Sequence, residues 1–246
     1  MKLNRIILMI VLGLVVSTTS LGVRGAWATP ALPERVERAL TILETHNQAA
    51  PRFRFERETY KKGERTELKL FNPTREITDR WAVAFPSMEE DPKEHTKLQK
   101  KYAGWDGNSD IALLVPDLRK RMGKGATFLR AEDNTEIYEF ELTDEYILEG
   151  GGLKSEIAKH LKGEIAIDIH TNFIRWIRYY APEHFKPVSL VKLKFYEITQ
   201  HIAPAWENGP FVRVYETSKV HGSAPFTSIN VDEVMINTNL SPAPAR

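Results

Sequence analysis

The chain has 246 residues, contains no cysteine and carries a formal net charge of +1 at neutral pH. A chain without cysteine cannot build a disulfide framework, and a nearly neutral chain lacks the basic charge that is typical of nucleic-acid binding. Its length suits one large β-rich domain that an ordinary hydrophobic core stabilises.

Residues 1–28 have the three parts of a secretory signal peptide. Lys2 and Arg5 form the basic start, residues 6–16 form the apolar core, and Ala26-Trp27-Ala28 fits the cleavage site. An uncleaved anchor is the alternative, but the core is shorter than the roughly 20 residues that span a bilayer. We therefore expect cleavage after Ala28 and a periplasmic protein with no transmembrane anchor. Cleavage removes three basic residues and no acidic one, which leaves a net charge of −2.

We expect one domain over residues 29–240 and a proline-rich tail at 241–246. The domain starts with an amphipathic helix at residues 33–47, because proline stands in its first turn and apolar residues recur with the helical period. Three strands with alternating apolar residues follow it: residues 52–60, 64–71 and 81–85.

Acidic and basic side chains are mixed along the first strand, in which Phe53 and Phe55 point inward. The mixed residues are Arg54, Glu56, Arg57 and Glu58. Opposite charges on neighbouring strands of a wet face favour ion pairing. This pattern favours a solvated, ion-paired face, and the alternative is an anion-binding stripe.

The pattern becomes helical in an insertion around residues 86–124. Asp91 suits the cap of a polar helix over residues 92–102, because proline follows it at the first helical position. Only Leu98 and Tyr102 are strongly apolar in this helix, which predicts that it lies on a surface rather than in a core. The insertion is either a lid or partner-docking element, or a simple cover for a sheet edge.

The elements after this helix alternate between helix and strand. Residues 117–122 form a short helix, and two strands follow at 126–130 and 135–142. The three glycines at 150–152 make a flexible joint. Ser155 then caps a short amphipathic helix that leads into the last strands.

Residues 163–238 form an antiparallel meander with one buried face. A two-residue turn at Thr171-Asn172 sets the register of its first hairpin. The facing pairs are then Ile169 with Ile174, Ile167 with Trp176, and Asp168 with Arg175.

The later strands of the meander also alternate. Three apolar side chains share the buried face of the next strand, and Tyr196 faces the other way with two lysines. The three are Val191, Leu193 and Phe195. Two more strands are expected at 211–220 and 226–238, the second with a bulge near Asp232-Glu233.

The sequence contains no recognised catalytic motif. It lacks a nucleophile elbow, a phosphate-binding glycine loop, a dinucleotide fingerprint and a His-Glu-x-x-His pattern. The seven histidines are scattered at spacings that indicate no metal site. We therefore expect a protein that is not an enzyme and that uses no cofactor and no metal.

The order of elements resembles the LolA-like family of periplasmic half-barrels. The residues that carry the resemblance are the 33–47 helix leading into Phe53-Arg54-Phe55, the block 161–168 with its following turn, and the Val220-His221-Gly222 turn before the last strand. The resemblance implies an α+β, predominantly antiparallel fold whose curved half-barrel sheet packs helices on its concave side and encloses an apolar space for acyl chains. The helical insertion departs from the compact carriers, so the chain is more similar to other exported relatives.

Two functions remain open. The first is a non-enzymatic binding protein that holds a lipid or a lipid-modified partner, such as a lipoprotein, in its apolar concave face. Its ligand-binding residues would be Ile165, Ile167, Ile169, Trp176, Val191, Leu193 and Phe195. The same pattern also fits a plain core.

The second is an envelope assembly or regulatory factor that contacts a protein partner without a small ligand. It would use a strand edge or the helices of the insertion, and the proline-rich tail is consistent with it. An exported hydrolase ranks third, because no catalytic constellation supports it.

Overall fold

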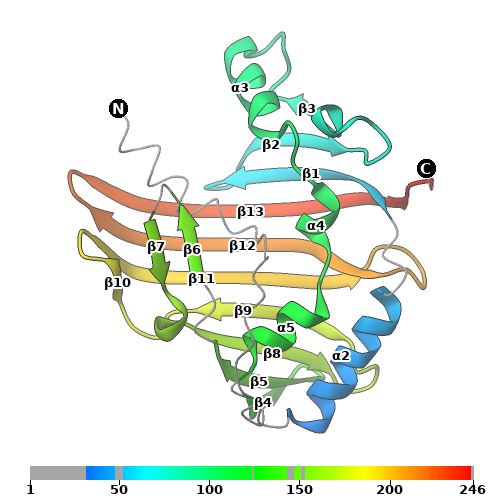
Figure 1. The fold of residues 1–246 in the computed structure, drawn as a ribbon, viewed down its shortest axis with the longest axis vertical. Helices are drawn as coiled ribbons and strands as arrows, with labels where there is room; N and C mark the ends of the chain where they lie inside the picture. Colours follow the sequence, from blue (N-terminus) through cyan, green and yellow to red (C-terminus); the bar gives the residue numbers. More distant parts are fainter. Residues whose placement is uncertain (1–31, 48–51, 124, 143–146, 151–152, 245–246) are drawn as a thin grey trace, which may run out of the picture.

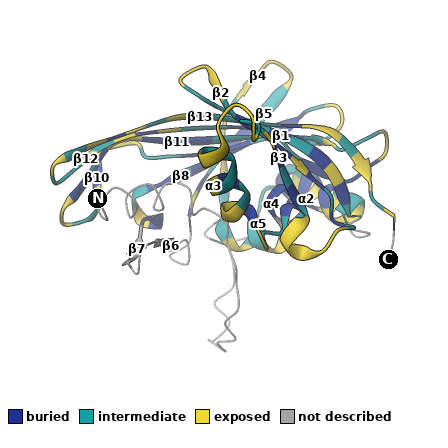
Figure 2. Cartoon of the chain, turned by 90° about the horizontal axis from the view of Figure 1, so that it is seen from above, coloured by how far each residue is buried: buried dark blue, intermediate teal, exposed yellow. Residues whose placement is uncertain are grey.

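The computed structural model describes residues 32–47, 52–123, 125–142, 147–150 and 153–244. These residues form a curved, unclosed antiparallel sheet of eleven strands, with helices on its concave side (Figures 1 and 2). The predicted fold class is therefore confirmed. The expected leader at 1–28 and the last two residues of the expected tail lie outside the described residues. No helix within the described ranges is long and apolar enough to cross a membrane.

The helices are α2 (Glu34–Asn47), α3 (Pro92–Tyr102), α4 (Gly107–Ile111) and α5 (Val115–Arg121), with short 3-10 turns at Ile77–Asp79 and Ala158–His160. The strands are β1 (Phe53–Lys61), β2 (Glu64–Phe71), β3 (Trp81–Phe85), β4 (Ala126–Glu132), β5 (Thr135–Glu141), β6 (Ile147–Gly150), β7 (Leu153–Glu156), β8 (Lys162–Asp168), β9 (Ile174–Tyr180), β10 (Phe185–Val188), β11 (Val191–Pro204), β12 (Phe211–Ala224) and β13 (Thr227–Pro242).

The large sheet has the strand order β3-β2-β1-β13-β12-β11-β9-β8-β5-β4, and β10 pairs with β11. Strands β6 and β7 form a separate hairpin. Because β1 pairs with β13, the first and last strands meet inside the sheet and join its two parts.

One half of the concave face is apolar and lies under α2 and α5. The predicted stripe of α2 is confirmed, since Val36, Leu40 and Leu43 are at most 2% exposed. They pack with apolar side chains of β5, β8, β9 and β11 in one continuous cluster. We call this region the apolar half.

The other half lies over β1, β2 and the adjoining parts of β12 and β13, under α3 and α4. An aromatic cluster that includes Phe53, Phe55, Phe71 and Trp81 fills one end of it. Further along the same strands, charged side chains replace the aromatic ones on the inward face and are buried. They are Arg57, Glu67, Lys69, Glu216 and Glu233. We call this region the charged half.

Helix α3 covers the sheet edge formed by β3. The side chain of Asp91 accepts a hydrogen bond from the Glu94 backbone N–H, so the predicted cap is confirmed. Gln99 donates to the carbonyl of Trp81 at 2.7 Å and accepts from the backbone N–H of Val83 at 3.1 Å. These bonds satisfy backbone groups of the edge strand. Helix α3 therefore covers a sheet edge, which is one of the two roles that we considered for the insertion.

Helix α3 lies on the surface of the domain, as predicted, but its two apolar residues reach into a core. Leu98 and Tyr102 are only 4% and 5% exposed, and both pack in the aromatic cluster of the charged half. Two apolar residues suffice because they are one turn apart and face the same way, and the Tyr102 ring lies 5.8 Å from that of Trp81.

The predicted register of the first meander hairpin is also wrong. Strands β8 and β9 pair Ile167 with Ile174 and Ala166 with Trp176, and a bulge lies between the two pairs. The cause is a longer turn, in which the Asp168 carboxylate accepts backbone hydrogen bonds from the next residues of the loop. The expected ion pair of Asp168 with Arg175 is present at 2.8 Å.

A second bulge changes the facing of β11. Its register with β12 shifts between Leu193 and Phe195, so Phe195 turns outward and Tyr196 turns into the apolar half. The predicted alternation is therefore wrong beyond Leu193. Gly222 of β12 permits the close approach there, because a Cβ at this position would lie 2.3 Å from the carbonyl oxygen of Lys192.

Two smaller expectations also need correction, and one helix was missed. Ser155 lies in β7, and only a 3-10 turn follows it instead of an amphipathic helix. Strand β13 pairs with β12 without a break at Asp232-Glu233, and its irregularity lies opposite Arg54 and Glu56 instead. Helix α4 was not expected, because five residues are too short for a periodic signal.

Candidate ligand-binding site

The structure brings together four of the seven predicted lining residues. Ile165, Ile167, Val191 and Leu193 are buried in the apolar half. Beneath α2, the space between Ala39, Leu43, Phe173 and Phe211 has an accessible volume of about 0 Å³. Side chains of the helix therefore fill this part of the apolar half.

The other three predicted lining residues lie elsewhere. Ile169 is half-buried in the loop after β8, where its carbonyl accepts a hydrogen bond from Arg35. Trp176 lies on the outer face of β9, and Phe195 lies on the outer face of β11 with its ring 5.7 Å from that of His221. The prediction that all seven share one face is thus wrong.

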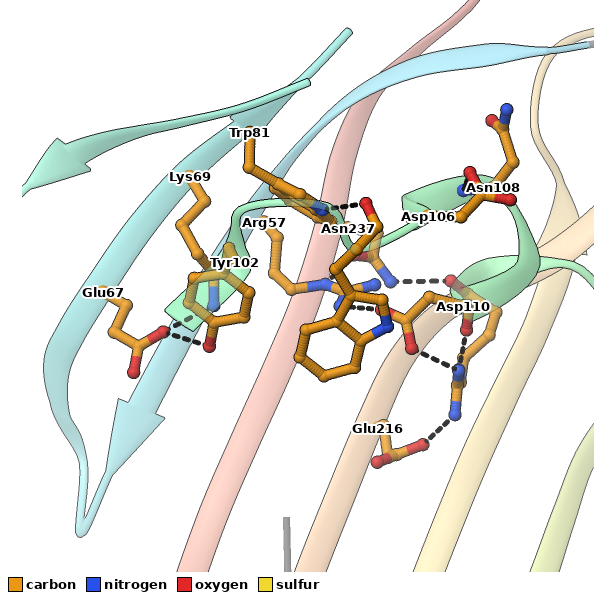
Figure 3. A network of polar contacts seen from close by, with 12 residues as sticks. Arg57, Glu67, Lys69, Trp81, Tyr102, Asp106, Asn108, Asp110, Glu216 and Asn237 are labelled. Carbon is orange, nitrogen blue, oxygen red and sulfur yellow. Dashed lines mark hydrogen bonds and ion pairs between the residues drawn. The ribbon is translucent and has the colours of Figure 1, made fainter. Parts of the chain in front are cut away.

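An open cavity of about 210 Å³ lies in the charged half. Strands β1, β2, β12 and β13 form its floor, and the segment from the end of α3 to α4 borders it (Figure 3). Its wall combines charged groups with four apolar residues: Trp105, Ile198, Val231 and Met235.

Asp110 of α4 holds one side of the cavity together. Its carboxylate pairs with the guanidinium groups of Arg57 and Arg213, all three being largely buried (Figure 3). Burial alone would raise the pKa of Asp110, but the two arginines outweigh burial and lower it. Arg213 also donates to Glu216 at 2.5 Å, and Arg57 donates to Asn237 at 2.8 Å.

Helix α4 can carry Asp110 into this position because it begins at a glycine. Asp106 caps the helix, and its side chain accepts from the Asn108 backbone N–H. A Cβ on Gly107 would lie 2.7 Å from the rings of Phe71 and Trp81. Any larger residue would therefore push α4 away from the aromatic cluster and Asp110 away from its arginines.

Glu67, Lys69 and Tyr102 form a second charged group on the other side of the cavity. Lys69 and Tyr102 donate to the same oxygen of Glu67, at 2.5 and 2.8 Å, and the Lys69 ammonium lies 4.0 Å from the Tyr102 ring. Burial would raise the pKa of Glu67, but Lys69, Lys101 and the two donors lower it to about 2. Burial lowers the pKa of Lys69 to about 8.

Glu233 differs from the other acidic residues of the cavity. Burial raises its pKa, and the neighbouring carboxylate of Glu67 adds to this effect. Its nearest cation is Lys61, whose ammonium is 3.6 Å away and whose side chain is 42% exposed. Lys61, Lys62 and Lys101 place three ammonium groups around the cavity.

The spacing of these residues in the sequence indicates that they point inward, although we expected a solvated outer face. Arg57 is in phase with Phe53 and Phe55, and Lys69 is in phase with Phe71, so both point inward. The expected ion-paired outer face is present for Glu58, which pairs with Arg65 at 3.3 Å, but the prediction is wrong for Arg57.

The described residues contain no group of three or more His, Asp or Glu side chains that could hold a metal ion. Comparison of the chain with protein-family models, with curated proteins and with solved structures found no match to any of them.

Proposed function

We propose that the chain is an exported, LolA-like binding protein that is not an enzyme and that holds an amphipathic ligand, a lipid or a lipid-modified partner, in the cavity of the charged half. The observation that carries this proposal is the open cavity of about 210 Å³ in the concave face, in contrast to the filled space under α2. The proposed ligand site therefore lies in the charged half and not in the apolar half, where the sequence pattern suggested it.

The cavity wall matches an amphipathic molecule. Val231, Met235 and Ile198 offer apolar contact for a chain, while the lysines offer charge for an acidic head group. Thr59 also lines the cavity, and its buried hydroxyl has no hydrogen-bond partner among the described residues.

A binding role is supported by how two of the acidic groups, Asp110 and Glu67, are held. The Asp110 carboxylate is fixed between two arginines, and Glu67 accepts from both Lys69 and Tyr102. A general base must be free to take a proton, whereas these carboxylates are held ionised by their donors. Their arrangement therefore favours a binding role.

The test is native mass spectrometry of protein recovered from exporting cells, followed by organic extraction and lipid analysis. Ser218→Trp should lose the co-purifying lipid, because Ser218 lines the cavity and an indole would occupy it. Thr217→Trp is the matched control, since it places the same indole on the opposite face of β12 and should keep the lipid.

Two results would contradict the proposal. The first is a ligand-free mass for the wild-type chain with no uptake of a fluorescent fatty acid, which would favour a protein-contact role without a small ligand. The second is equal lipid retention by both tryptophan variants, which would place the lipid outside this cavity.

A further inference from the structure

Two turns project side by side from one end of the large sheet. Pairing of Val188 with Val191 closes the β10–β11 turn, and pairing of Ala224 with Thr227 closes the β12–β13 turn. Lys192 pairs with Ser223, so the two turns belong to neighbouring strands. They lie at the left end of the sheet in Figure 1 and extend beyond its helix-covered part in Figure 2. We call residues 186–194 and 219–228 the tip.

Each turn carries a large apolar side chain that points into solvent. Leu190 is 70% exposed and Phe226 is fully exposed. Phe226 also has a φ of 64°, in the left-handed region that favours glycine or asparagine. Packing does not explain a phenylalanine here, and the backbone disfavours it, so an external role is the physical reason to place it there.

The tip is basic. It contains Lys186, Lys192, Lys194 and Lys219, and the stretches 184–196 and 217–231 contain no acidic residue. Lys219 faces Glu197 and Asp232 on the neighbouring strands, so the positive charge of the tip comes mainly from Lys186, Lys192 and Lys194. Exposed apolar groups surrounded by lysines are the combination that binds an anionic lipid surface.

We propose that the tip docks on an anionic lipid bilayer, with Leu190 and Phe226 inserted at the interface and the lysines at the head groups. A bilayer fits better than a protein partner because two side chains on separate turns offer little continuous apolar area. A stable protein interface needs about 800 Å² on each partner. This docking is independent of the proposed ligand, because no residue of the tip lines the cavity.

The first test is flotation of the protein with vesicles of phosphatidylglycerol and phosphatidylcholine, and with vesicles of phosphatidylcholine alone. The protein is recovered from exporting cells and its N-terminus is determined, so that every variant has the same ends. Wild type should bind the anionic vesicles, and added salt should weaken this binding.

Phe226→Ser should lower the vesicle affinity by about tenfold, because it removes the larger of the two inserted side chains. The matched control is Phe128→Ser. Phe128 lies on edge strand β4 and is 56% exposed, so it has the same chemistry away from the tip. This variant should bind as wild type does.

Charge reversal tests the second half of the proposal. Lys186→Glu with Lys194→Glu should abolish binding to the anionic vesicles, while Lys93→Glu with Lys100→Glu on α3 should leave it unchanged. All four lysines are exposed, and the two pairs make the same change in net charge.

Three outcomes would overturn the proposal: no vesicle binding by wild type, equal binding to neutral and anionic vesicles, or equal losses in the tip variants and their controls. If vesicle binding is absent but the chain self-associates in a way that Phe226→Ser prevents, the tip contacts a second copy of the chain instead. Lipid analysis of the same variants separates this result from the cavity, since Phe226→Ser should keep any ligand that Ser218→Trp loses.

Discussion

The two halves of the concave face lie on one sheet, but their buried side chains pack differently. The apolar half is closed by a helix whose leucines interdigitate with isoleucines of β8 and β9. The charged half is closed by α3 and α4, and a cavity of about 210 Å³ remains between its side chains. Apolar groups can pack at any orientation, whereas ion pairs need fixed distances and directions, so charged groups leave space between them.

The difference matters for function because burying charge is expensive. Ion pairs in a protein interior often stabilise less than apolar residues of the same size would. A core made only for stability would therefore continue the aromatic row of Phe53 and Phe55 through the position of Arg57. The charged half keeps Arg57, Lys69 and Asp110 instead, which is expected of a site that must present polar groups to a ligand.

The largest effect should come from a charge placed in the apolar half. Ile167 is 0% exposed, so Ile167→Glu should cost about 5 kcal/mol or more and prevent folding. Phe195→Glu is the control, because Phe195 is 42% exposed and should cost less than about 1 kcal/mol. Circular dichroism shows whether each variant folds, and urea unfolding followed by circular dichroism measures the stability of Phe195→Glu. A folded Ile167→Glu variant that only loses its ligand would make the apolar half the binding site.

Removing the shared anion of the charged half should have the next largest effect. Asp110→Asn leaves the buried guanidinium group of Arg57 without its carboxylate and leaves Arg213 with Glu216 alone, which should cost about 4 kcal/mol of unfolding free energy. Glu94→Gln removes an exposed ion pair with Lys97 and should cost less than about 0.5 kcal/mol. If both variants unfold at the same urea concentration, the two arginines are hydrated through the cavity and do not depend on Asp110.

Local patterns predicted the elements of this fold but not all of its registers. The helix over 33–47 and the strand from Phe53 were predicted because each depends on the spacing of apolar residues along one segment. The register shift between Ala166 and Ile167 depends on the turn that the Asp168 carboxylate organises, and the bulge at Lys194 depends on the close approach of Gly222 from β12. No periodicity within β8 or β11 records those contacts.

The residues of the candidate site also divide into those that local patterns could predict and those that they could not. The inward facing of Arg57 and Lys69 follows from their phase with the aromatic residues and could have been predicted. The position of Asp110 could not be predicted. Its carboxylate pairs with Arg57, 53 residues away, and its backbone carbonyl accepts a hydrogen bond from Arg213, 103 residues away. Its helix has five residues and depends on a close approach at Gly107 that only the folded chain defines.

The third effect is smaller and compares two acids within the charged half. Glu67 has a pKa of about 2 in the folded protein, below its ordinary value of 4.5. Its contribution to stability is therefore complete above pH 4.5 and is lost as the pH falls toward 2, which amounts to about 3 kcal/mol. Glu67→Gln should remove this part of the acid-induced loss of stability, measured by urea unfolding at a series of pH values.

Glu233 provides an internal control of opposite sign. Its pKa is raised in the folded protein, so it takes up a proton before the unfolded chain does and favours the folded state as the pH falls. Glu233→Gln should therefore steepen the acid-induced loss of stability, whereas Glu67→Gln should flatten it. Both carboxylates line the same cavity, so a general effect of removing one negative charge would move both variants in the same direction. Parallel shifts would show that the ion pair of Glu67 with Lys69 does not set the acid stability of the charged half.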